Sequence, residues 1–147
     1  MFAAPQPFAT RRGPAFGALA YQTTAVEIQV AGADPHRLVA LLFQGFEQSL
    51  AEALGAIAQR DTERKCRAIT RALRIVDEGL RGALDLKAGG TLARDLNDLY
   101  GYVVQRLSQA NARNDPALLA ECKRLIQPLH EAWLAIGPSP AAAGPRP

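Results

Sequence analysis

The stretch Leu84 to Asp115, LDLKAGGTLARDLNDLYGYVVQRLSQANARND, contains a helix end, a tight connection, a complete amphipathic helix and the start of another helix. Gly89 and Gly90 supply the positive-φ positions at which a helix ends, and Thr91 is expected to cap the helix that follows. From there apolar residues recur at steps of three and four, which places them on one helical face. The predicted core stripe is Leu92, Leu96, Leu99, Val103, Leu107 and Ala110.

Three more helices are predicted around this stretch. Asp34-Pro35 and Asp115-Pro116 each place a capping carboxylate before a proline, and proline suits the first helical position because its missing N–H is not needed there. Asp61-Thr62 offers another cap. The helices are expected at about 34–60, 61–88, 92–111 and 116–136.

The last of these helices contains an internal proline. Pro128 lacks the N–H that would bond the carbonyl of Arg124, so we expect a kink or a break near residues 124–127. The predicted core stripe of this helix is Leu118, Cys122, Leu125, Leu129, Ala132 or Trp133, and Ile136.

The second helix carries two apolar stripes. The main one predicts core: Cys66, Ile69, Leu73, Val76, Leu80 and Leu84. The other lies about 120° around the helix and mixes small with apolar residues: Ala68, Ala72, Ile75, Gly79, Gly82 and Leu86. Two interpretations fit: close approach of a neighbouring helix, or a shallow groove that binds a partner's amphipathic helix and continues onto Tyr100 and Val104.

Arginines follow the same helix at steps of three and four: Arg60, Arg64, Arg67, Arg71 and Arg74. A charge run of this kind is usually a solvated face, partly neutralised here by nearby acidic residues. Acidic groups of a protein partner and nucleic acid are the other interpretations. The formal charge of +3 and pI near 9.2 do not decide among them.

Composition predicts one all-α domain, since 48% of the 147 residues are hydrophobic but only 6% are aromatic. No run is long and apolar enough to span a membrane, and no secretion signal begins the chain, so a cytoplasmic protein is expected. Cys66 and Cys122 each fall on a core-facing position and are expected to be reduced, buried thiols. His36 and His130 lack ligand-spaced partners and are expected at the surface. We predict no enzymatic activity, no metal site and no cofactor.

The chain resembles a known family at two places. The first comprises Gly89, Gly90, Leu96, Leu99, Tyr100, Tyr102, Leu107, Ala110, Asn111 and Asp115. The second is VAGADPHRLVALLFQG, residues 30–45, with Val30, Ala33, Pro35, Leu38, Val39, Leu42 and Gly45 in register. In both the chain resembles the FliS family of flagellin export chaperones. It departs from the family pattern at Phe43-Gln44, Thr91 and Gly101.

The resemblance implies a chaperone that binds the disordered C-terminal segment of flagellin, prevents premature polymerisation and delivers flagellin to the flagellar type III export gate. It also implies that an N-terminal segment containing Tyr21 docks over part of the binding surface. For the client surface we predict Ala68, Ala72, Ile75, Gly79, Gly82, Leu86, Tyr100 and Val104.

The predicted architecture is an antiparallel up-down four-helix bundle at residues 21–136, with a flexible arm at 1–20 and a disordered tail at 137–147. We expect a monomer or weak homodimer that neither binds nucleic acid nor inserts into a membrane. Two alternatives are a bundle that self-associates through the second-helix groove and, less favoured, a nucleic-acid binder that uses the residues 60–74.

Overall fold

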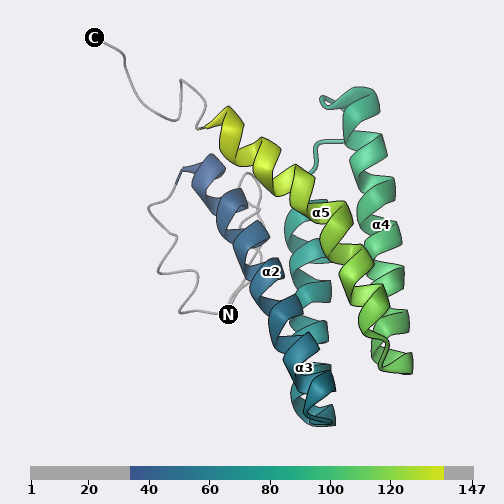
Figure 1. The fold of residues 1–147 in the computed structure, drawn as a ribbon. Helices are drawn as coiled ribbons and strands as arrows, with labels where there is room; N and C mark the ends of the chain where they lie inside the picture. The colour runs from purple at the N-terminus through teal and green to yellow at the C-terminus, as the bar shows by residue number, and fades with distance from the viewer. Residues whose placement is uncertain (1–33, 138–147) are drawn as a thin grey trace, which may run out of the picture.

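Four antiparallel helices form the part of the chain that the computed structural model describes, residues 34–137 (Figure 1). They are α2 (Pro35–Ala58), α3 (Thr62–Arg74) with its π-helical continuation η1 (Ile75–Arg81), α4 (Gly90–Arg113) and α5 (Pro116–Ile136). Each helix packs beside its neighbours in the chain, and α5 returns to pack on α2. The predicted all-α up-down bundle is therefore confirmed. Tyr21, the arm at 1–20 and the tail beyond Gly137 lie outside the described residues.

Three of the predicted helix caps are confirmed. Asp34 accepts a hydrogen bond from the backbone N–H of Arg37 at 2.8 Å. Asp61 and Asp115 cap α3 and α5 in the same way, at 3.1 and 2.9 Å. The predicted cap at Thr91 is wrong, because α4 begins at Gly90, two residues before the predicted start, and the Thr91 hydroxyl accepts from the side chain of Arg94 instead. The three aspartates thus set where α2, α3 and α5 begin.

The connection before α4 is longer than predicted, since the second helix ends at Arg81 and not near Ala88. Asp85 holds this connection by accepting from two backbone N–H groups that follow it. Of the two glycines, only Gly90 has a positive φ, 59°. Gly89 is required for space, because a Cβ there would lie 2.5 Å from the Cβ of Ala93.

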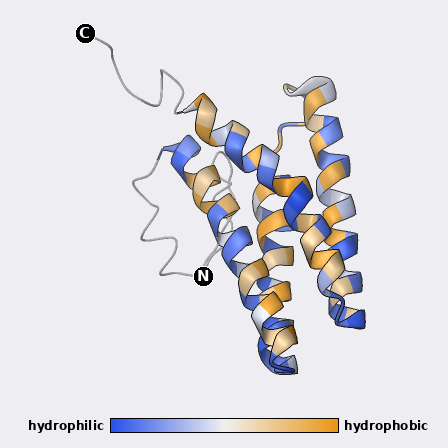
Figure 2. Ribbon diagram, viewed as in Figure 1, coloured by the Kyte–Doolittle hydropathy of each residue, from blue (hydrophilic) through white to orange (hydrophobic). Residues whose placement is uncertain are grey.

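The core lies along the bundle axis, where the apolar faces of all four helices meet (Figure 2). Its largest fully buried apolar side chains are Phe46, Leu50, Ile69, Leu107, Leu119, Ile126, Val76 and Val103. Two large predicted core residues are exposed: the exposed fraction is 68% for Leu92 and 71% for Ile136. Both lie at the end of the bundle where α4 begins and α5 finishes.

Helix α5 continues unbroken through Pro128, so the predicted break is wrong. Pro128 and Arg124 are both exposed, and water can therefore satisfy the carbonyl that the proline leaves unbonded. Cys66 and Cys122 are free thiols; Cys122 is buried as predicted, whereas Cys66 is only half-buried. Burial raises the pKa of Cys122 to about 12.

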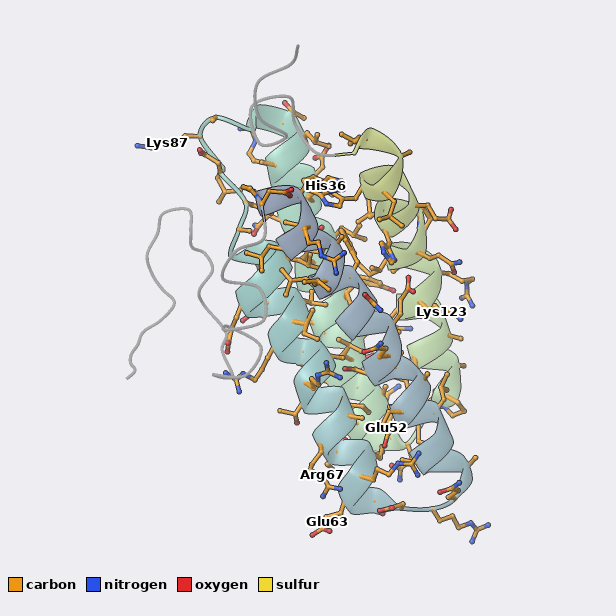
Figure 3. All side chains as sticks on the ribbon, turned by 90° about the vertical axis from the view of Figure 1, so that its left-hand side faces the viewer. His36, Glu52, Glu63, Arg67, Lys87 and Lys123 are labelled. Carbon is orange, nitrogen blue, oxygen red and sulfur yellow. The ribbon has the colours of Figure 1, made fainter. Side chains whose placement is uncertain are left out.

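The two histidines are not free at the surface, as the sequence had suggested, but join α2 to α5. The rings of His36 and Trp133 stack at 5.0 Å, and the Trp133 indole N–H donates to the His36 carbonyl at 2.9 Å. One turn earlier on α5, His130 lies 2.9 Å from the Glu47 carboxylate and stacks on Phe43. Figure 3 shows His36 at the start of α2, beside α5. These contacts hold the last turns of α5 against α2.

Candidate functional site

Three of the four small residues of the second-helix set lie inside the bundle. Ala68, Ala72 and Gly79 are buried. A Cβ on Gly79 would lie 2.8 Å from Leu42 of α2, so the missing side chain is what admits that leucine. Gly79 therefore fits the first of the two interpretations of this stripe, in which small residues allow the close approach of a neighbouring helix.

The other members of the predicted set are more accessible. Ile75 is half-buried at the boundary with α2, where its Cδ1 would contact a Cβ placed on Gly45 at 3.2 Å. Gly82 and Leu86 are exposed in the connection before α4, with Leu86 47% exposed. The structure thus separates the set into a buried layer and a few apolar groups that a partner could contact without unfolding the bundle.

The two predicted residues of α4 also differ in their access to solvent. Tyr100 is buried, and this burial raises the pKa of its hydroxyl to about 12. Val104, one turn further along α4, is half-buried and packs against the core cluster. Only Val104 offers an accessible side chain of this pair.

An arginine of η1, Arg81, reaches across to Asn97 and Gly101 of α4. The Arg81 guanidinium donates to the Asn97 side-chain oxygen at 2.9 Å and lies 3.4 Å from the Asp77 carboxylate. It also covers Gly101, where an added Cβ would lie 3.3 Å from an Arg81 nitrogen. The departure from the family pattern at Gly101 thus has a structural reason. Spacing along one helix gave no sign of this role of Arg81, because Asn97 and Gly101 lie on another helix.

A polar cluster spans α4 and α5 on the outside of the bundle. Glu121 accepts from the Tyr102 hydroxyl at 2.6 Å and from Arg106 at 2.8 Å. These two hydrogen bonds lower the pKa of Glu121, and the bond from Tyr102 raises the pKa of that tyrosine. The cluster fixes the orientation of an exposed aromatic ring, and sequence reasoning did not identify it as a unit.

The arginine stripe is largely engaged by carboxylates. Arg64 donates to Glu52 of α2 at 2.5 Å, and Arg74 lies 3.3 Å from Glu78 on its own helix. Arg67 and Glu63 approach to 3.7 Å near the start of α3 (Figure 3). All three contacts involve exposed or partly exposed side chains, which is typical of a solvated face.

A buried lysine that the sequence did not single out joins α3 to the end of α4. Lys65 is 4% exposed, and its ammonium donates to the Asn111 carbonyl at 2.8 Å and to the Asn114 side chain. A cavity of about 350 Å³ lies beside it, lined by Ala56, Ile57, Arg60, Asp61, Thr62, Lys65 and Asn114. The lysine supplies hydrogen bonds that the last carbonyls of α4 lack.

Between residues 34 and 137 no group of three or more His, Cys, Asp or Glu side chains could hold a metal ion. In the same range no helix is long and apolar enough to cross a membrane. What the surface does offer is apolar side chains on a rigid helical frame, the kind of surface onto which an amphipathic helix docks.

Comparison with known proteins points to one family. The family model described as flagellar protein FliS matches residues 17–140. The flagellar secretion chaperone FliS of Salmonella typhimurium is 40% identical over 124 residues, which cover 84% of this chain and 92% of that protein. FliSB of Pseudomonas aeruginosa is 42% identical over 113 residues, covering 77% and 89%. FliS of Bacillus subtilis is 32% identical over 114 residues, covering 78% and 80%.

Proposed function

The chain belongs to the FliS family of flagellar secretion chaperones, and we propose that it binds the disordered C-terminal segment of flagellin before export. The match of the family model over residues 17–140 carries this proposal. A chaperone role in flagellar export follows from membership of the family, which is a non-enzymatic kind of protein. Flagellin as the client, its C-terminal segment as the bound region and the cytoplasm as the location are the proposed details.

The client surface that we propose contains both layers of the predicted set. Ile75, Gly82, Leu86 and Val104 are the members that a client can contact directly. The buried members, Ala68, Ala72, Gly79 and Tyr100, lie beneath and determine how closely the helices approach one another. A change in the buried layer would therefore alter the shape of the surface.

The energetics suit a reversible chaperone. A disordered client gains about 25 cal/mol for each Å² of apolar surface it buries, but it loses conformational entropy as it becomes ordered. Because only part of the proposed surface is accessible in the unbound bundle, the net gain is modest. In this proposal, bound flagellin cannot polymerise, and it is released at the flagellar export gate.

Calorimetric titration of the full chain with the C-terminal segment of flagellin from the same organism tests this function. We expect saturable binding near one to one, with a negative heat-capacity change and binding retained at moderate salt. A segment of the same composition in scrambled order is the control, because it keeps the charge and removes the apolar periodicity. If the native and scrambled segments bind equally well, or neither binds, the proposal is wrong.

A further inference from the structure

The cavity beside Lys65 lies where α2 turns into α3 and α4 turns into α5, and we call it the turn-end cavity. Its lining combines the positive charges of Arg60 and Lys65 with the aliphatic side chain of Ile57. A water molecule occupies about 30 Å³ in the liquid, so a cavity of about 350 Å³ has room for a group of several heavy atoms. Its size and lining therefore suit a small organic ligand or one side chain of a partner.

Lys65 lies on the buried side of this cavity, with only 4% of its surface exposed. A lysine ammonium has three N–H groups. Two of them donate to neutral oxygens, those of the Asn111 carbonyl and the Asn114 side chain, and residues 34–137 supply no third acceptor. The negative end of the α4 dipole offsets part of the charge, but a buried ammonium without an anionic partner remains costly. Lys65 therefore keeps one donor and part of its positive charge for an anion.

The carboxylates at this end of the bundle are already engaged elsewhere. Each accepts a helix-capping N–H or pairs with an arginine of the α3 stripe: Asp61, Asp115, Glu52 and Glu63. In the described part of the chain neither Arg60 nor Lys65 pairs with a carboxylate. The lining holds two cations and the one carboxylate of Asp61, a net charge of +1. The cavity is therefore electrostatically suited to a negative group.

Arg60 is placed at the solvent side of the cavity by the turn that ends α2. Its φ is 58°, and the N–H of the next residue, Asp61, donates to the Ala56 carbonyl at 2.8 Å, which closes the end of the helix. The Arg60 side chain is exposed and lines the cavity. A ligand in the cavity would thus meet a guanidinium on its solvent side and the ammonium of Lys65 on its buried side.

We infer that the turn-end cavity binds an aliphatic carboxylate, with its oxygens on Lys65 and Arg60 and its methylene groups against Ile57. Hydrogen bonds from a guanidinium or an ammonium to a carboxylate are stronger than those between neutral groups. A free dicarboxylate and a glutamate side chain of a protein partner present the same group, a carboxylate on a short methylene chain. The cavity lies at the start of α3, whereas Ile75 and Gly82 of the proposed client surface lie beyond its far end, so this site does not depend on flagellin binding.

The test is a titration of the isotope-labelled full chain with glutarate at low salt, followed by the chemical shifts of the backbone amides. We expect saturable shifts at residues 57–65 and at Asn114, with a dissociation constant on the order of 1 mM. Sulfate is the matched probe, because it is also a dianion but has no methylene groups. It should bind at least about threefold more weakly, since it buries no apolar surface against Ile57. Equal or tighter binding of sulfate would overturn the assignment of an aliphatic ligand.

Two variants test the cationic side chains separately. Lys65→Met should weaken glutarate binding about tenfold or more, because it removes a buried charged donor. Arg60→Asn should weaken it about threefold, since an exposed charge contributes less, and asparagine tolerates the positive φ. The control is Lys123→Gln, which removes an exposed charge further along α5 (Figure 3) and should change the dissociation constant by less than about 1.5-fold. If Lys65→Met is too unstable to titrate, Arg60→Asn decides, and equal affinity of Arg60→Asn and the control would overturn the inference.

A blocked tripeptide with one central glutamate distinguishes the two sources of the carboxylate, and the same peptide with glutamine is its control. If the glutamate peptide shifts the same amides and competes with glutarate, the cavity accepts a side chain of a protein partner. If only glutarate binds, the ligand is a free dicarboxylate. Equal shifts with the glutamate and glutamine peptides would show that the carboxylate is not recognised, and the absence of saturable shifts with both glutarate and the glutamate peptide would show that there is no such site. Either result overturns the inference.

Discussion

The ammonium of Lys65 on α3 donates to the backbone carbonyl of Asn111 near the end of α4, 46 residues further along the chain, at 2.8 Å. A buried cation at this position satisfies carbonyls that the end of an α-helix leaves without intrahelical partners. The contact therefore ties the α2–α3 turn to the α4–α5 turn at one end of the bundle.

Replacing Lys65 by methionine should lower the free energy of unfolding by about 1–3 kcal/mol, because methionine fills the space but leaves the Asn111 carbonyl and the Asn114 side chain unsatisfied. Urea denaturation followed by circular dichroism measures the change. Lys123→Met, at an exposed position of α5, is the control and should stay within about 0.5 kcal/mol of wild type. Equal stabilities would mean that Lys65 does not hold the helix end.

Alanine at Gly79 should destabilise the bundle by about 1–3 kcal/mol, since the added methyl group overlaps Leu42 in a closely packed helix pair. Gly55→Ala serves as the comparison, because its methyl group would meet only the flexible end of the Arg64 side chain. Thermal and urea unfolding of both variants measure the difference in their stability. A Gly79 variant that is as stable as the Gly55 variant would contradict the packing described here.

Ile75→Ser should weaken binding of the flagellin segment about tenfold while the chain remains helical, because it removes an apolar contact from the accessible layer of the proposed client surface. Leu73→Ser is a matched control, since Leu73 is also half-buried on α3 but lies on the main core stripe. It should cost similar stability and change the dissociation constant by less than about twofold. Calorimetry and far-ultraviolet circular dichroism measure the two effects, and equal loss of binding in both variants would argue against a role for Ile75 in the client surface.

The pKa of Glu121 is lowered by its hydrogen bonds from Tyr102 and Arg106, so Glu121 should stabilise the bundle in a pH-dependent way. A lowered folded-state pKa means that this contribution is complete above the usual glutamate pKa, which is 4.5, and is lost as the pH falls through the folded-state pKa. Glu121→Gln should therefore be less stable than wild type at pH 7, and the difference should shrink in acid. Urea midpoints measured from neutral to acidic pH test this, and a difference that does not change with pH would contradict it.

Capping and periodicity allowed much of the bundle to be predicted from the sequence. Asp34, Asp61 and Asp115 cap the predicted helices because a cap depends only on residues within one turn. The connection before α4 was predicted less well. A glycine pair indicates a turn. Whether a glycine is needed because its φ is positive, as at Gly90, or because a neighbouring residue lies too close for a side chain, as Ala93 does at Gly89, depends on the folded structure.

Client-surface residues were harder to predict than helices. The stripe that includes Ala68, Ala72 and Gly79 is apolar and small, and these properties suit a groove and a helix contact equally well. Arg81 over Gly101 and the Glu121 cluster depend on contacts between different helices, which no spacing within one helix reveals. The exposure of Leu92 and Ile136 likewise depends on how different helices are placed relative to one another.

Local patterns in the chain were thus sufficient to establish four helices, their order and the face that each turns inward, because propensity, capping and apolar spacing act over a few residues. The packed bundle settled which inward-facing side chains find a partner. His36 and Trp133 are separated by 97 residues, and their contact draws the end of α5 to α2 and away from Leu92. Burial depends on the position of whole helices, so this exposure becomes visible only once all four are packed together.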